Sequence, residues 1–114
     1  LYGQTILPAP VWHGHTPVLA FRFGAFAYVT DTNNIPDQSL ALLGGLDVLI
    51  LDALRAEPHP THFNFSQALE IVRLLQPRYT YFTHLTHTTL HAEVEPTLPE
   101  NVFLAYDGLR LEVD

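Results

Sequence analysis

Three strand-like stretches of this sequence run through apolar residues and then stop abruptly at a histidine or an aspartate. In chain order these residues are His13, Asp31 and His84. A strand that ends in such residues is how a sheet presents metal ligands at its rim. Neutral imidazole and carboxylate suit zinc, manganese and iron, and one carboxylate can bridge two ions. The pattern predicts a metal site at the rim of a sheet, and three unrelated surface or capping residues are the alternative.

The composition narrows the class of protein. A chain of 114 residues fits one small domain. Without cysteine it has neither disulfides nor thiolate ligands, which permits the cytoplasmic location that we expect. It contains no run of roughly 18 apolar residues, so we expect no membrane contact. The formal net charge is −7 and the 5 basic residues are scattered, which is a poor footprint for nucleic acid.

Local patterns predict the order of the secondary structure. We expect a short strand over 5–7 ending at Pro8, and a hairpin of 18–23 and 25–30 with a loop of a few residues around Gly24. A helix over 37–43, a strand over 47–52 and a helix that begins at Asn64 and ends before Pro77 should follow. The last predicted elements are a strand over 79–83, a short helix over 88–95, and a hairpin of 102–106 and 109–113. This order predicts an α/β fold, a mixed sheet with helices mainly on one face.

Several of these motifs, taken together, resemble a known family. They are Pro10-Val11-Trp12-His13, Val29-Thr30-Asp31-Thr32 with Ile35-Pro36, Leu51-Asp52, His62, Thr83-His84-Leu85-Thr86-His87 and Tyr106-Asp107-Gly108. In this order they resemble the second half of a metallo-β-lactamase-fold hydrolase, nearest to the cyclic phosphodiesterase of the carbon–phosphorus lyase pathway. The resemblance implies a four-layer αββα sandwich, of which residues 1–114 would be roughly the C-terminal half, with the N-terminal half absent.

The resemblance also implies a cofactor and a set of site residues. It implies two divalent metal ions, zinc or manganese with iron as a third option. His13, the bridging Asp31 and His84 would be the metal ligands. His62 would contact phosphate or protonate a leaving alkoxide as the catalytic residue. The motif His-x-His-x-Asp-His, which supplies most ligands in this family, does not occur in the sequence. Because Leu1 opens inside a strand-like segment, we expect these ligands in a missing N-terminal half.

Other histidines and one aspartate compete for roles at this site. His15 competes with His13, and His59 competes with His62 in a loop rich in proline and histidine. His87 either orients His84 or is exposed on the surface. Asp52 ends a buried strand, and we expect it to hold a ligand histidine in one tautomer, as acceptors beside metal-bound imidazoles do.

The predicted function is metal-dependent hydrolysis of the phosphodiesterase type, in which metal-activated hydroxide attacks a small-molecule phosphate ester. Activity would require the missing half. One alternative is a nuclease that processes tRNA 3′ ends, and another is a thioester or lactone hydrolase of the same superfamily. A third alternative is a non-catalytic fragment that acts as a structural or interaction module. In that case its unpartnered sheet face would be exposed or buried in a homodimer.

Overall fold

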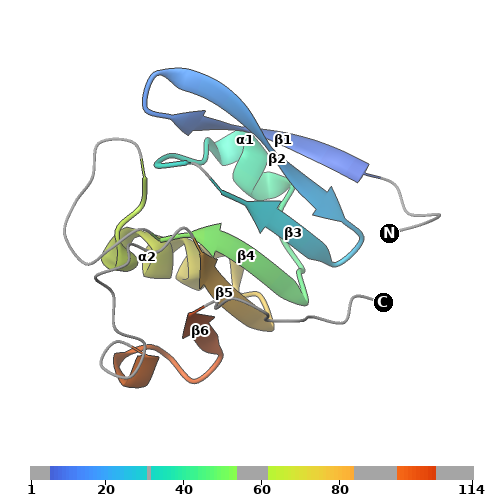
Figure 1. Cartoon of the computed structure of the whole chain (residues 1–114). Helices are drawn as coiled ribbons and strands as arrows, with labels where there is room; N and C mark the ends of the chain where they lie inside the picture. Colours follow the sequence, from blue (N-terminus) through green and yellow to red (C-terminus); the bar gives the residue numbers. More distant parts are fainter. Residues whose placement is uncertain (1–5, 31, 54–61, 84–94, 105–114) are drawn as a thin grey trace.

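The computed structural model describes residues 6–30, 32–53, 62–83 and 95–104, which form one mixed sheet of six strands with two helices (Figure 1). The elements are β1 (Ile6–His13), β2 (Thr16–Phe23), β3 (Phe26–Val29), α1 (Asp37–Ala41), β4 (Val48–Asp52), α2 (Phe65–Leu75), β5 (Tyr79–Thr83), the 3₁₀ turn η1 (Glu95–Thr97) and β6 (Val102–Leu104). The order of strands in the sheet is their order in the chain. The first two pairings are antiparallel and the last three are parallel.

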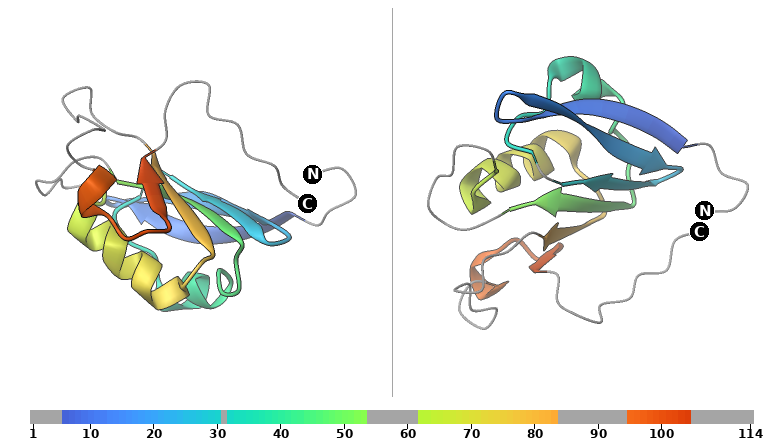
Figure 2. Two further views of the ribbon diagram at one scale, coloured as in Figure 1. Left: turned by 90° about the horizontal axis from the view of Figure 1, so that it is seen from below. Right: turned by 45° about the horizontal axis from the view of Figure 1, so that its top comes forward.

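Both helices lie on the same face of the sheet (Figure 2). α1 connects β3 to β4 and α2 connects β4 to β5, and both pairs of strands are parallel neighbours. A crossover between parallel strands of one sheet is almost always right-handed. Both crossovers connect to the next strand in the same direction along the sheet, so their helices lie on the same side. The predicted mixed α/β sheet with helices on one face is confirmed.

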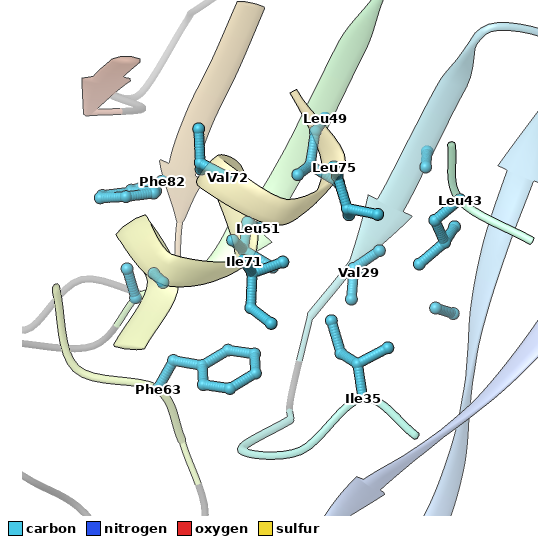
Figure 3. Close-up of a cluster of buried hydrophobic side chains, with 14 of the residues drawn as sticks. Val29, Ile35, Leu43, Leu49, Leu51, Phe63, Ile71, Val72, Leu75 and Phe82 are labelled. Carbon is cyan, nitrogen blue, oxygen red and sulfur yellow. The ribbon is translucent and has the colours of Figure 1, made fainter. Parts of the chain in front are cut away.

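The core fills the space between this face and the helices. Leu49 and Leu51 of β4 are fully buried against α2, which contributes Ile71, Val72 and Leu75 (Figure 3). Period-2 burial along the strands and 3.6-residue spacing on the helix bring these side chains to one interface. In the described part of the chain, no helix is long and apolar enough to cross a membrane.

The opposite face of the sheet, which we call the open face, carries a row of large apolar side chains. The strand register places them side by side in the order Pro8, Phe21, Tyr28, Ile50, Tyr81 and Phe103. Phe21 is 37% exposed and Tyr28 is 45% exposed, and Leu19 beside them is 52% exposed. Exposed apolar surface of this extent is typical of a surface that another element covers.

Several sequence predictions differ from the structure at the first strands. The predicted end of the first strand at Pro8 is wrong, since β1 continues through Pro8 and Pro10 to His13. β1 is an edge strand, and residues two apart direct their nitrogens to the same side, so both prolines can face away from β2. β1 and β2 form a hairpin that was not predicted, with a two-residue turn containing Gly14 at φ 63°. The β2–β3 hairpin is confirmed, but its turn has two residues instead of a longer loop.

The helices and the last strands follow the predictions closely. α1 ends at Ala41, two residues before the predicted end. α2 has the predicted capping box, in which the Asn64 side chain accepts from the Gln67 backbone and the Gln67 side chain accepts from the Asn64 backbone. α2 ends before Pro77, as predicted. Its last residue is Leu75, and Gln76 caps it with φ 48°. The helix predicted over 88–95 lies outside the described residues except for Glu95, which begins η1. Of the hairpin predicted over 102–106 and 109–113, the structure describes residues 102–104, which form β6.

Candidate functional site

The direction of the strands brings two of the predicted site residues, His13 and Asp52, to one edge of the sheet. β1 and β3 are each antiparallel to β2, so they run in the same direction, and β4 and β5 are parallel to β3. The carboxyl ends of these four strands therefore lie at one edge, where ligands bind in open α/β sheets. His13 ends β1 and Asp52 ends β4 at this edge. Asp31 and His84 lie outside the described residues.

Three side chains at this edge form a continuous line. The Nδ1 atom of His62 is 2.6 Å from Oδ2 of Asp52. On the other side of the ring, Nε2 of His62 is 3.3 Å from Nε2 of His13, and the two rings meet edge to face at 65°. Asp52 is fully buried and His62 is 8% exposed. An aspartate, an imidazole and a second imidazole are thus in direct contact beneath the edge of the sheet.

The surrounding hydrogen bonds assign the proton on His62. Oδ2 of Asp52 also accepts a hydrogen bond from the backbone N–H of Thr32 at 2.9 Å. An atom that accepts from a backbone N–H acts as an acceptor toward His62 as well, so Nδ1 of His62 carries the proton. In the neutral ring, Nε2 then carries a lone pair, which accepts from Nε2 of His13 in the tautomer of His13 that is protonated there. Asp52 therefore fixes both the orientation and the tautomer of His62.

The segment after β3 holds the end of β1 in place. Trp12 and Asn34 form an isolated bridge in which the Trp12 N–H donates to the Asn34 carbonyl at 2.9 Å. The Asn33 N–H donates to the Trp12 carbonyl at 3.0 Å, and the Gly14 N–H donates to Oδ1 of Asn33 at 3.0 Å. His13 lies between Trp12 and Gly14. Its position is therefore tied from both sides to the segment that carries Asp31.

The structure separates some of the competing candidates by position. His13 is half-buried and contacts His62, whereas His15 is exposed in the β1–β2 turn. Asp52 contacts His62, the residue predicted for catalysis, so the ring that it orients differs from the ligand histidine that we expected. His59 and His87 lie outside the described residues.

Thr32 and Asn33 are also parts of this site, although neither was predicted to be. The signal that could have found them was the position of these two hydrogen-bonding side chains directly after Asp31 at the end of a predicted strand.

The donor set at this edge fits a divalent metal ion only in part. The imidazole of His13 is a suitable ligand for zinc, manganese or iron. Its Nε2 faces His62, so a metal bond at that atom and the contact with His62 are alternatives. Within the described ranges no three histidine, aspartate or glutamate side chains are arranged so that they could hold a metal ion together. Two of the three predicted ligands, Asp31 and His84, lie outside those ranges.

Comparison with known proteins identifies the superfamily. A family model described as "Beta-lactamase superfamily domain" matches residues 2–85, and the chain belongs to this superfamily. The chain is also similar, at 46% identity and a TM-score of 0.96, to the crystal structure of a diphosphatase from the PhnP family, covering 100% of this chain and 45% of that protein. These similarities confirm the predicted resemblance to a metallo-β-lactamase-fold hydrolase near the PhnP family.

Two further relatives show how far the similarity extends. The chain is 30% identical over 112 residues to an octanoyltransferase of Porphyromonas gingivalis, covering 96% of this chain but 23% of that protein. Human tRNase Z, short form, matches with a TM-score of 0.77 at 17% identity and is covered over 44% of its length, which shows the fold alone. The chain thus spans about half the length of the solved relatives it matches.

Proposed function

We propose that this chain is the C-terminal half of a metal-dependent hydrolase that cleaves small-molecule phosphodiesters. The observation that carries the proposal is the contact of Asp52, His62 and His13 at the carboxyl edge of the sheet. The 46% identity to a diphosphatase supports a phosphoryl substrate. The 5 basic residues of the sequence support a small substrate over RNA, because RNA binding needs more extensive neutralisation of phosphate.

His13, Asp31 and His84 would hold the metal ions on this half of the protein, with Asp31 as the bridge between two ions. Two zinc or manganese ions, or iron, would when bound lower the pKa of a water molecule and polarise the phosphoryl oxygen. The remaining ligands would come from the rest of the polypeptide, since the His-x-His-x-Asp-His motif does not occur in these residues.

His62 would act as the general acid. Its Nδ1–H is donated to Asp52, so the ring is held with Nε2 directed toward His13 and the candidate metal site. When the ring takes up a second proton, that proton is on Nε2, and the buried carboxylate of Asp52 stabilises the resulting imidazolium. Transfer of this proton to the leaving oxygen would complete the cleavage of the ester.

The open face would be covered by the remaining half of the same polypeptide. Its exposed apolar residues Leu19, Phe21 and Tyr28 lie side by side on neighbouring strands. The chain covers 45% of the diphosphatase that it resembles, which leaves a comparable length to form a second layer. A homodimer through this face is the other arrangement, and the mass of the protein in solution distinguishes the two.

Metal content and hydrolysis of the full-length protein test the proposal. We expect close to two equivalents of metal per subunit and metal-dependent hydrolysis of a phosphodiester. Asp31→Ala and His84→Ala should lose both metal and activity. His62→Ala should retain metal but lose turnover, and the exposed His15→Ala serves as the control. Near-wild-type hydrolysis by both Asp31→Ala and His84→Ala would refute the metallohydrolase function.

A further inference from the structure

Thr32 is hydrogen-bonded to three parts of the candidate site. Thr32 is fully buried although it lies beyond the carboxyl end of β3. Its backbone N–H donates to Oδ2 of Asp52 at 2.9 Å. Its carbonyl accepts from the N–H of Phe63, the residue after His62, at 3.1 Å. Its hydroxyl is 2.6 Å from the carbonyl of Trp12, the residue before His13.

The hydroxyl completes this set of contacts with a defined geometry. A hydroxyl has one hydrogen to donate and can accept as well. The Trp12 carbonyl at 2.6 Å is nearer than the Asn34 carbonyl at 3.0 Å, so the hydroxyl donates to Trp12. The same oxygen accepts from the Asn34 N–H at 3.2 Å. The hydroxyl therefore binds the end of β1 to the segment that follows β3.

We infer that Thr32 is a positioning residue, which sets the distance between His13 and the Asp52–His62 pair. This inference rests on the proposed function of the site. Each of the three elements that carry these residues is bonded to Thr32 either at the residue itself or at its immediate neighbour. The backbone bonds fix Asp52 and Phe63, and the hydroxyl bond fixes Trp12. Removing the hydroxyl takes away one of the bonds that hold Trp12, and both backbone bonds of Thr32 remain, so we expect His13 to shift relative to the Asp52–His62 pair.

Thr80 provides a matched control within the same sheet. Thr80 in β5 is also fully buried, but its hydroxyl has no hydrogen-bond partner among the described residues. It lies near the start of β5, at the opposite end from the candidate site. Valine is close in shape to threonine, so Thr80→Val removes a buried hydroxyl without removing a contact to the site.

The experiment compares Thr32→Val, Thr32→Ser and Thr80→Val in the full-length protein. Replacing a residue that orients a metal ligand without binding the metal itself lowers metal affinity or activity by about 10- to 100-fold. We expect a loss of this size in kcat or in manganese affinity for Thr32→Val. Thr32→Ser keeps the hydroxyl, so its kcat and its manganese affinity should stay within about threefold of wild type, a difference of less than 1 kcal/mol. Thr80→Val should match wild type. Thr32→Ala deletes the same hydroxyl if valine prevents folding.

A second measurement separates this inference from the proposed function. In the metal-free protein, ¹⁵N NMR of the imidazole nitrogens of His13 and His62 reports their contact without any catalysis. Thr32→Val should shift the His13 and His62 signals, and Thr32→Ser and Thr80→Val should leave them unchanged. Unchanged signals in Thr32→Val, or an equal effect of Thr32→Ser, would overturn the positioning role. Absence of metal binding and hydrolysis in the wild type, with the NMR shift present, would refute the proposed function alone.

Discussion

Replacing Asp52 with asparagine tests the chemical role of the buried carboxylate. Oδ2 of Asp52 accepts from both the His62 ring at 2.6 Å and the Thr32 backbone at 2.9 Å. Asparagine has the same shape, but its amide supplies one oxygen acceptor and an NH₂ donor. Because one oxygen of Asp52 makes both contacts, an asparagine oxygen in that position still accepts from Thr32 and from His62 but carries no charge. The variant therefore removes the negative charge beside His62 with little change in packing.

The magnitude of the effect follows from the loss of the charge on the acceptor of this hydrogen bond. A hydrogen bond to a charged group contributes about 1.5–3 kcal/mol. If the transition state loses about 2 kcal/mol of this stabilisation, kcat should fall about 30-fold when protonation of the leaving group is required. Metal content should not change, because Asp52 contacts His62 and is not one of the proposed ligands.

The leaving group of the substrate provides the decisive assay. A cyclic phosphodiester releases an alkoxide and requires a proton donor, whereas bis(p-nitrophenyl) phosphate releases a stable nitrophenolate. Asp52→Asn should lower kcat strongly on the cyclic substrate and only weakly on the nitrophenyl substrate. Asp47→Asn is the matched control, since Asp47 is exposed and precedes the other end of β4. Equal losses on both substrates, or a loss of metal, would refute the assignment of His62 as the general acid.

Three further predictions concern the free energy of unfolding of the full-length protein, measured by urea denaturation. Leu51→Ala should lower it by about 3 kcal/mol, because Leu51 is fully buried against α2. The exposed Leu74→Ala should stay within about 0.5 kcal/mol of wild type, and an equal loss in both variants would contradict this core. Asn64→Ala should cost about 1 kcal/mol through loss of the capping box, whereas the exposed Ser66→Ala should not. Gln76→Gly should raise the free energy of unfolding by up to about 1 kcal/mol, since Gln76 has φ 48°, and a decrease would show that its side chain contributes more than this strain costs.

The elements whose signals are local could be predicted from the sequence. The apolar run of β4 and the capping box of α2 each depend on residues within a few positions of one another. The hairpin between β2 and β3 likewise depends on Gly24, which adopts a positive φ of 60°. The order of these elements was sufficient to predict a mixed sheet with helices on one face. The metallo-β-lactamase superfamily followed from motifs that are specific only in combination.

Features that depend on neighbouring strands could not be predicted in the same way. Pro8 and Pro10 usually end a strand, and they are accommodated here because β1 is at the edge of the sheet. The contact between Asp52 and His62 joins the end of β4 to a residue just before α2, ten positions later in the chain. Its partner could not be inferred from spacing, so the sequence favoured a ligand histidine as the group that Asp52 orients.

The register of β1 depends on the two-residue turn that joins it to β2. Gly14 adopts φ 63° in the two-residue connection between β1 and β2, and this short connection fixes the pairing of His13 with Thr16. A slip of one residue in this pairing would turn the side chains of β1 to the opposite faces of the sheet. His13 would then lose its contact with His62 even if every residue of the site were retained. The geometry of the candidate site is therefore determined by the register of the first hairpin as much as by its histidines.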